Sequence, residues 1–461
     1  MQWLITARIA GAAAGGVAAA FLYAAPAAAA GTVAVPCHSA ALASAIGDAA
    51  SGETLSLAAN CTYPLTAALP AIGQDLTIVG NHATLSRSDA PATPKFTILS
   101  VDAGTLSVTG LNFSNGAGAI AGTDAGSISV SGGRFTGNHA TNGGAIYSST
   151  GPGSLSVTDA TFVRNRATQA GGAIYTSEAA ALTTVAGSRF TENTAGTMGG
   201  AIYNFFDMNV SNSTFDANKA DDGGAIFNNG QDGDSLTDVT VRGNTATQDG
   251  GGVVTWECAL SVTDSRISAN HAGSEGGGLY QYLLAGYPDG LTMTGTRVLT
   301  NTANNGAGVY ANDAVMNLSS STISGNSATA DGGGVYNDGA VPAFGNINLS
   351  SSTVSSNTAG TDGGGLYNTQ GTVDAAGTPI EHNTAGAGGG IYDGPGPDTV
   401  TLTNSPVQGN TPDNCEPAGT ITGCPGTGAD VAPQAAAHGG SEAVRRHAVP
   451  RLSQNGSLVA G

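Results

Sequence analysis

Acidic side chains recur at one position of a repeating pattern, immediately before a glycine turn. The occupants of this position are Asp222, Asp249, Glu275, Asn305, Asp331 and Asp362. If successive repeats stack as strands, these side chains lie about 4.8 Å apart, and like charges that close repel unless protons or cations neutralise them. Oxygen ligands favour calcium, so the five acidic members are a candidate Ca²⁺ site. Asp and Asn also form turns before glycine without any metal, and earlier repeats have Asn142, Ala170 and Met198 here, so both interpretations stay open.

Aromatic and acidic side chains cluster between residues 205 and 289, where the repeats are interrupted. The sequences NFFD, TWEC and YQYLLAGYPDG supply the candidates, which are Phe205, Phe206, Trp256, Glu257, Tyr282, Tyr287 and Asp289. Exposed aromatic rings beside carboxylates can stack on sugar rings, and this favours a ligand-binding site for a carbohydrate. The same rings could instead pack beneath the longer insertion that follows Tyr280, and this alternative also stays open.

Two short motifs must position these residues. One is GGAIY, at residues 143–147 and 171–175 and, with variations, in later repeats. The other is an apolar residue, two variable residues and an asparagine, with successive asparagines 25 to 31 residues apart. The asparagines are Asn138, Asn165, Asn193, Asn218, Asn244, Asn270, Asn301, Asn326, Asn357, Asn383 and Asn410. Stretches such as SLSVTDATF alternate apolar and polar residues, which predicts short strands. A unit of this length cannot bury its apolar side alone, so neighbouring units must stack.

Alternation along these strands predicts which columns of side chains face inward. Glycine permits the tight turn with positive φ, and the aliphatic residue after it, such as Ile146 or Ile174, is expected to face the core. Tyr147 and its counterparts then lie on the opposite face. The asparagines are expected to hydrogen-bond backbone and one another along the stack.

The alternating GGAI and FxxN motifs resemble the repeats of polymorphic outer membrane proteins, within the pectate-lyase-like group. The resemblance covers residues 105–410. It implies an all-β fold, a single-stranded right-handed parallel β-helix with a short N-terminal capping helix. Related enzymes cleave acidic polysaccharides, but the Gly-His-Gly and Arg-x-Lys motifs of such hydrolases are missing from this sequence. We therefore predict no catalytic residue.

The chain divides into four predicted parts. Residues 1–30 combine a positive charge, an apolar run and small residues, which indicates a signal peptide. Residues 31–104 are the N-terminal cap and first coils, with a helix in SAALASAIGDAA whose N-cap would be Ser39. Residues 105–424 are the β-helix repeats, and residues 425–461, rich in Pro, Gly and Ala, are a predicted disordered tail with solvated arginines.

Five cysteines fit an oxidising compartment. Cys37 and Cys61 bracket one N-terminal unit and Cys415 and Cys424 a short C-terminal loop, so each pair is a candidate disulfide, although sequence alone does not fix connectivity. Cys258 is left over and is expected to be a buried, inert thiol. We expect a secreted or cell-surface protein with no membrane span after signal removal.

Net charge excludes one class of partner and leaves three classes of function. The 461-residue chain has a net charge of −19, which argues against nucleic acid because phosphate binding needs clustered cations. The preferred prediction is a monomeric, non-enzymatic β-helix with an extended face for a polysaccharide or a surface glycan or protein. The alternatives are a polysaccharide lyase or glycoside hydrolase, and a structural, self-associating surface protein.

Overall fold

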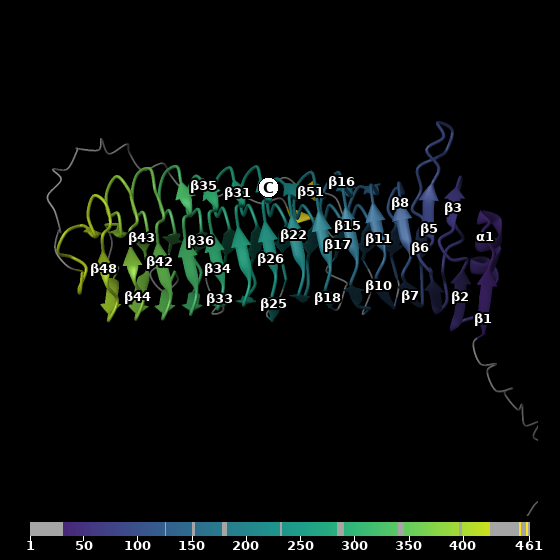
Figure 1. The fold of residues 1–461 in the computed structure, drawn as a ribbon, viewed down its shortest axis with the longest axis horizontal. Coiled ribbons are helices and arrows are strands. Elements are labelled where there is room, and N and C mark those ends of the chain that lie inside the picture. The colour runs from purple at the N-terminus through teal and green to yellow at the C-terminus, as the bar shows by residue number, and fades with distance from the viewer. Residues whose placement is uncertain are drawn as a thin grey trace, which may run out of the picture.

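The chain coils into a parallel β-solenoid of about 14 turns (Figure 1). The computed structural model describes residues 31–424 except 125, 150–152, 178–181, 231–232, 284–289, 340–344 and 396–398, together with two short strands near the C-terminus. Each full turn adds one strand to each of three long parallel sheets, which we call sheets A, B and C. The predicted all-β parallel β-helix is confirmed.

Sheet A presents a flat face of short polar side chains. Leu155 and Val157 of β14 point inward, whereas Ser156 and Thr158 point outward, and the neighbouring strands keep this alternation in register. Its fifteen strands are β1 (Thr32–Val35), β2 (Glu53–Leu57), β4 (Leu76–Val79), β7 (Thr105–Thr109), β10 (Ser127–Ser131), β14 (Leu155–Thr158), β18 (Thr183–Ala186), β21 (Met208–Ser211), β25 (Asp234–Thr237), β29 (Leu260–Thr263), β33 (Leu291–Thr294), β37 (Met316–Ser319), β41 (Ile347–Ser350), β44 (Thr372–Ala376) and β47 (Thr399–Thr403).

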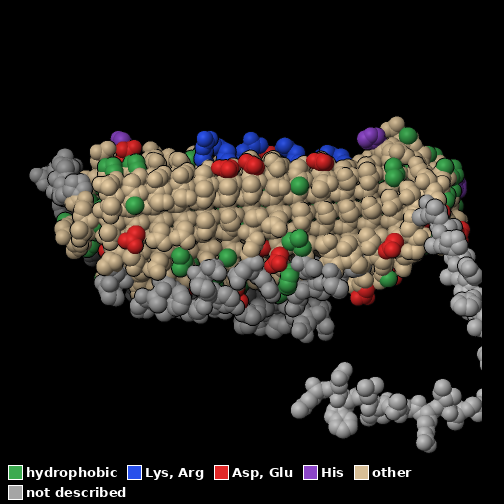
Figure 2. Space-filling view, turned by 90° about the horizontal axis from the view of Figure 1, so that it is seen from below, with side chains coloured by type: hydrophobic (Ala, Val, Ile, Leu, Met, Phe, Trp, Pro, Cys, Tyr) green, Lys and Arg blue, Asp and Glu red, His purple; other side chains and the backbone are tan. Residues whose placement is uncertain are grey.

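Sheet B carries the exposed arginines. The exposed Arg189 and Arg242 both pair with Asp216, which is partly buried, and Arg164 pairs with Glu192, both of them exposed. Figure 2 shows Lys and Arg side chains in one row along an edge of the solenoid, next to acidic side chains. The fourteen strands are β3 (Thr62–Leu65), β5 (Thr84–Arg87), β8 (Asn112–Ser114), β11 (Arg134–Thr136), β15 (Thr161–Val163), β19 (Arg189–Thr191), β22 (Thr214–Asp216), β26 (Thr240–Arg242), β30 (Arg266–Ser268), β34 (Arg297–Leu299), β38 (Thr322–Ser324), β42 (Thr353–Ser355), β45 (Ile380–Glu381) and β48 (Val407–Gln408).

Sheet C is built from the strands that follow the glycine turns. Its thirteen strands are β6 (Leu99–Val101), β9 (Ile120–Gly122), β13 (Ile146–Ser148), β17 (Ile174–Thr176), β20 (Ile202–Asn204), β24 (Ile226–Asn228), β28 (Val253–Trp256), β32 (Leu279–Tyr282), β36 (Val309–Asn312), β40 (Val335–Asp338), β43 (Leu366–Gln370), β46 (Ile391–Asp393) and β49 (Cys415–Glu416).

Two short ladders lie in the chain between the strands of sheets B and C. One pairs two strands and the other five, all of two residues. They are β12 (His139–Ala140) with β16 (Arg166–Ala167), and β23 (Lys219–Ala220), β27 (Thr245–Ala246), β31 (His271–Ala272), β35 (Thr302–Ala303) and β39 (Ser327–Ala328).

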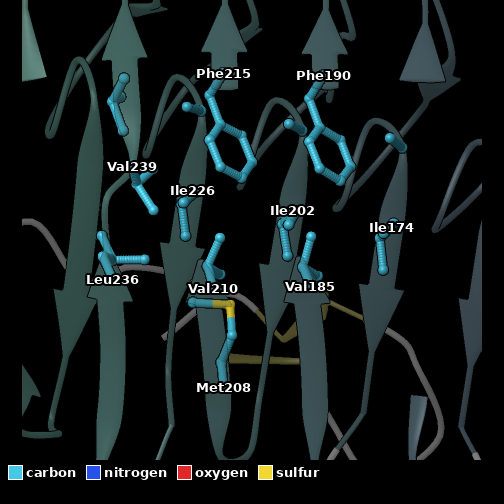
Figure 3. Packing of buried hydrophobic residues seen from close by; sticks show 14 of the residues in the cluster. Ile174, Val185, Phe190, Ile202, Met208, Val210, Phe215, Ile226, Leu236 and Val239 are labelled. Carbon is cyan, nitrogen blue, oxygen red and sulfur yellow. The ribbon is translucent and has the colours of Figure 1, made fainter. Parts of the chain in front are cut away.

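The core consists of columns of like residues from consecutive turns. Ile174, Ile202 and Ile226 of sheet C are fully buried, which confirms the inward aliphatic column (Figure 3). Phenylalanines of sheet B stack beside them, with the ring centroids of Phe190 and Phe215 4.7 Å apart. The uniform spacing of the turns therefore lets identical side chains fill the core repeatedly.

The asparagine column forms the predicted ladder. All eleven asparagines are buried. Asn165, for example, donates from its backbone N–H and its Nδ2 to Oδ1 of Asn193, both at 3.0 Å. Its Nδ2 also donates to the carbonyl oxygen of Phe135. The column thus satisfies buried polar groups of successive turns and is part of the architecture.

The N-terminal end is capped by the one helix in the described residues, α1 (Ser39–Asp48). Leu42 and Ile46 bury one side of this helix against the first turn. The predicted N-cap was wrong by one residue: His38 is the N-cap, and the hydroxyl of Ser39 donates to the carbonyl oxygen of Pro64.

Both predicted disulfides are present. Cys37 bonds to Cys61, and Cys415 bonds to Cys424. The remaining cysteine, Cys258, is buried as predicted, and its burial raises the pKa of the thiol to about 12, which makes it a poor nucleophile at neutral pH.

The chain ends lie mostly outside the described residues. This applies to the predicted signal peptide, residues 1–30, and to most of the predicted disordered tail. Within the tail, β50 (Arg451–Leu452) and β51 (Leu458–Val459) are described, and they pair antiparallel in a sheet of their own. Among the helices in the described part of the chain, none has the length and hydropathy to cross a bilayer.

Candidate binding face on sheet C

The outer face of sheet C carries a column of stacked aromatic rings. Tyr147 is the first of a run in which neighbouring ring centroids lie 5.0–5.6 Å apart, through Tyr175 and Tyr203 to Phe227. A second run continues from Tyr280 towards the C-terminal turns. These residues alternate with the inward isoleucines, so the predicted outward direction is correct. We call them the tyrosine column.

The tyrosine column is deeply buried in the middle of the solenoid. The exposed fraction is 2% for Tyr203, 6% for Tyr280 and 2% for Tyr310. Towards both ends it is larger, and Tyr147 and Tyr392 are only partly buried. An outward column is therefore buried most in its central turns.

Trp256 and Tyr282 form a stacked pair two residues beyond the tyrosine column. They occupy matching positions of neighbouring strands, and their ring centroids lie 4.0 Å apart with 21° between the planes. Both side chains remain partly exposed. The indole Nε1 of Trp256 donates to Oε1 of Glu257 at 3.1 Å. The structure thus brings together three of the residues predicted from sequence.

The remaining residues of the predicted binding site do not belong to the stacked pair. Phe205 is partly buried and packs against the same aromatic cluster. Phe206 follows it and is also partly exposed, and its carbonyl oxygen accepts a hydrogen bond from Nδ2 of Asn204. Tyr287 and Asp289 lie outside the described residues.

Tyrosine hydroxyls reach the strand of the next turn. The hydroxyl of Tyr310 donates to Oδ2 of Asp338 at 3.0 Å, and that of Tyr280 bonds to Asn312. Burial, reinforced by the negative charge of Glu275, raises the pKa of both phenols well above the usual range. Both hydroxyls therefore stay protonated, and that of Tyr310 serves as a hydrogen-bond donor.

The residues immediately before the glycine turns also form a ladder. We call them the acidic column: Asp222, Asp249, Glu275, Asp331 and Asp362, with Asn305 at the same position. Oδ1 of Asp222 accepts a hydrogen bond from the backbone N–H of Asp249 at 3.1 Å, and Oδ1 of Asp249 accepts one from Glu275. Asn305 makes the same contact to Asp331. A neutral amide thus performs the same role as a carboxylate, which supports the turn-forming interpretation of this position.

Several acidic residues in this column hold protons unusually well. Burial, followed by the charge of Asp249, raises the pKa of Asp222 to about 7 and that of Glu275 to about 8. Burial also raises the pKa of Asp331. In the central turns, protons therefore relieve part of the charge repulsion that prompted the calcium prediction.

The acidic column does not form a metal centre among the described residues. Among the described residues, no group of three or more His, Cys, Asp or Glu side chains is placed to hold one ion. The column Asp222, Asp249, Glu275, Asp331 and Asp362 remains a predicted Ca²⁺ site, and we assign it no metal chemistry.

A polar cluster inside the solenoid was missed by the sequence analysis. Asp234 is buried, and its Oδ2 accepts a hydrogen bond from Nδ2 of Asn228 at 2.6 Å. Burial raises the pKa of Asp234 to about 6. The thiol of Cys258 lies against the same asparagine. The signal was available, because Asp234 occupies a position where the adjacent turns have Met208 and Leu260.

One surface depression mixes arginines with carboxylates. It has a volume of about 330 Å³, and Asp238, Asp264, Arg266 and Arg297 contribute to its lining. All four charged residues are exposed. Asp238 and Asp264 have positive φ angles of 53° and 49°, so they also form the corner between sheets A and B.

Comparison with protein families identifies the repeating unit. Four stretches match the Chlamydia polymorphic membrane protein repeat: residues 132–149, 159–177, 187–204 and 320–338. The chain carries polymorphic membrane protein repeats. Searches of curated proteins and of solved structures found no match to this chain.

Each matched polymorphic membrane protein repeat corresponds to the same part of a turn. It runs from a strand of sheet B, through an asparagine of the ladder and a glycine turn, to a strand of sheet C. Trp256 and Tyr282 lie between the third and fourth matched stretches. The pair therefore lies on turns outside the four matched stretches.

Proposed function

We propose that this protein is a non-enzymatic β-helix of the cell surface that binds a polysaccharide on the outer face of sheet C. The observation that carries the proposal is the stacked, partly exposed pair of Trp256 and Tyr282, 4.0 Å apart on adjacent strands. Aromatic rings fixed in this way offer a preformed surface on which sugar rings can stack.

The charge of this face selects the kind of polysaccharide. Asp338, Glu257 and the acidic column flank the aromatic rings, and the strands of sheet C contain no Lys or Arg. A polyanionic glycan would meet electrostatic repulsion here. We therefore propose a neutral glycan as the ligand.

Two observations support a surface location. The matched repeat is described as one of a membrane protein, and disulfides form and persist outside the reducing cytosol. Attachment to an outer membrane is the location that this family description favours.

Fluorescence titration tests the binding site. In a Trp3→Phe background Trp256 is the only tryptophan, so its emission can be followed during titration with neutral and acidic glycans. We expect a saturable change with a neutral glycan. The partner-ring variant Tyr282→Ala should weaken binding about tenfold, since stacking contributes on the order of 1 kcal/mol or more.

Tyr147→Ala is the matched control, because this tyrosine is also partly exposed on sheet C but lies several turns away. It should leave the affinity unchanged. No change of emission with any glycan would overturn the polysaccharide proposal at Trp256 and shift the balance towards a structural role.

The depression on the other side of the solenoid favours a second candidate, a polysaccharide lyase or hydrolase. Its mixture of Arg266 and Arg297 with carboxylates is the observation in its favour. Incubation of each glycan with the parent chain and with Arg266→Ala, followed by analysis of product length, tests it. Cleavage by the parent that is lost in the variant would establish the enzyme.

A further inference from the structure

The cations of this acidic protein are concentrated on one side of the solenoid. Of its fourteen Lys and Arg residues, eight lie between residues 134 and 297. They fall on strands of sheet B, on the short ladders, or directly after such a strand, with at least one in each of seven consecutive turns. We call these eight residues the basic row. All eight side chains are exposed, and Figure 2 shows Lys and Arg side chains in a row along one edge.

Carboxylates neutralise only part of the basic row. Arg164 pairs with Glu192, and Arg189 and Arg242 share Asp216. The remaining five members form no ion pair within the described part of the chain, and they are Arg134, Arg166, Lys219, Arg266 and Arg297. The row therefore keeps uncompensated positive charge, which an anionic partner could neutralise.

A histidine beside the row responds to the same positive charge. His139 belongs to β12, which pairs with β16 of the next turn. Burial, followed by the charges of Arg166 and Lys95, lowers the pKa of His139. At this end of the row, positive charges thus already act on a neighbouring side chain, and an anion would be favoured there.

Two unpaired arginines lie side by side at the other end of the row. Arg266 and Arg297 occupy matching positions of β30 and β34, so their backbones lie about 4.8 Å apart. Both contribute to the lining of the depression of about 330 Å³, to which Asp238 and Asp264 also contribute. An anionic group between the two guanidinium groups would relieve their repulsion and could accept hydrogen bonds from both.

The surroundings of the basic row argue against two other anionic partners. Single-stranded nucleic acid needs aromatic rings on which its bases stack, but the phenylalanines of sheet B are buried. A membrane surface is bound by apolar side chains that enter the lipid, but Val33, on sheet A, is the one large apolar side chain exposed in the described part of the chain. A straight row of cations about 29 Å long instead matches a linear chain of charged sugars.

We propose that the basic row binds a linear polysaccharide with closely spaced sulfate or carboxylate groups, its chain parallel to the long axis of the solenoid. Arg266 and Arg297 hold one anionic group at the depression. Arg134, Arg166 and Lys219 contact anionic groups farther along the polysaccharide. This site is separate from the aromatic pair on sheet C, and it does not depend on the binding of a neutral glycan there.

Isothermal titration calorimetry of the full chain with a heparin decasaccharide tests the proposal. The variant Arg266→Gln with Arg297→Gln should weaken binding about tenfold, because each arginine can make charge-assisted hydrogen bonds to an anionic group. Lysine at both positions keeps the charge and should recover most of the affinity. Arg445→Gln with Arg446→Gln changes the net charge by the same amount outside the strands of sheet B, so it should bind as the parent does. A neutral dextran of equal length should not bind.

A second variant increases the number of free cations. Asp216→Asn releases Arg189 and Arg242 from their ion pairs, so it should bind the decasaccharide more tightly than the parent at low salt. The proposal is wrong if the parent does not bind heparin, or if the sheet B variant and the tail variant weaken binding equally. It is also wrong if a single-stranded oligodeoxynucleotide of the same charge binds as tightly as heparin, since the row would then select charge and not a polysaccharide.

Discussion

Asn244 joins three turns of the solenoid through one buried side chain. Its Oδ1 accepts hydrogen bonds from the backbone N–H and the Nδ2 of Asn218, at 2.8 Å and 2.9 Å. Its Nδ2 donates to Asn270 and to the carbonyl oxygen of Phe215. Each asparagine in the ladder therefore satisfies groups that its neighbours cannot satisfy alone.

Asn244→Ala should destabilise the solenoid by roughly 2–4 kcal/mol, because it leaves two donors of Asn218 buried without an acceptor. Hydrogen exchange of the flanking turns and urea unfolding measure the effect. Asn209→Ala, at an exposed position on sheet A, is the matched control and should cost less than about 1 kcal/mol. Equal losses in the two variants would contradict the ladder argument.

The acidic column makes stability depend on pH. Asp222 and Glu275 have higher pKa values when folded, about 7 and 8, than their ordinary values of 3.8 and 4.5. Between these limits the folded state binds more protons than the unfolded state, so stability falls as pH rises from about 4 to about 8.

Asp222→Asn should reduce this pH dependence, since Asn305 already fills the same position in another turn and makes the same backbone contact. We expect the variant to gain stability on the order of 3 kcal/mol over the parent at pH 9 and to differ little at pH 4. Thermal unfolding across this range measures the difference. An Asp222→Asn variant with the same pH profile as the parent would contradict the assignment.

The side-chain columns could be predicted from sequence because the same residue type recurs at the equivalent position of each repeat. Ile174 and Asn165 belong to such columns, and strand alternation then placed Tyr175 on the outer face. The deep burial of Tyr203 could not be predicted, since it depends on contacts between residues distant along the chain, whereas the burial of Asp234 could have been inferred from Met208 and Leu260 at the same position of adjacent turns. The repeat spacing already placed Trp256 and Tyr282 at the same position of successive turns, which the register of β28 with β32 confirms, but the sequence did not decide whether the rings are exposed or packed.

The glycine turn is the element that starts each strand of sheet C. Gly223 has φ of +61°, and a Cβ atom there would lie 2.4 Å from the carbonyl oxygen of Ile226. Gly243 has nearly the same φ, +64°, but a Cβ atom there would meet its nearest neighbour at 3.7 Å. Substitution of either glycine would introduce backbone strain, but only substitution of Gly223 would also introduce a steric overlap.

Gly223→Ala should therefore destabilise the protein by roughly 3 kcal/mol, from strain and overlap together. Gly243→Ala carries only the strain of the left-handed conformation and should cost about 1 kcal/mol. Chemical denaturation of both variants provides the comparison. If the two substitutions cost the same, the close approach at Gly223 has no energetic consequence.

Strands and turns followed directly from the repeated sequence, but the interruptions did not. Residues 105–424 were predicted as repeats, and strands of all three long sheets occur throughout that range. The insertion after Tyr280 has no counterpart in neighbouring turns, so no repeated pattern constrained its conformation. Its aromatic residue Tyr287 consequently remains a prediction.

The whole molecule behaves as a stack in which each turn contacts its neighbours. Thr302 pairs with Ser327 and Asn301 bonds to Asn326, so residues 302–326 make up one complete turn between equivalent positions. Removing a whole turn keeps every column in register, whereas removing half a turn shifts strands to the wrong sheet.

Deletion of residues 302–326 should leave a folded solenoid with a cooperative unfolding transition and resistance to trypsin. Deletion of residues 302–313, about half of the same turn, should abolish both. Circular dichroism during heating and a trypsin time course measure the outcome. Loss of structure in the full-turn deletion would show that this turn has a role beyond repetition.

The asparagine ladder also determines how the molecule responds to mechanical force. Its hydrogen bonds run along the long axis, whereas the covalent chain circles around that axis. Tension applied between the two ends of the solenoid passes through every turn, and a terminal turn separates first because its strands are hydrogen-bonded to a neighbour on one side only. The molecule lengthens by unspooling one turn after another, and each turn of about 26 residues releases roughly 90 Å of chain. A surface protein built in this way can dissipate a pull in many small steps.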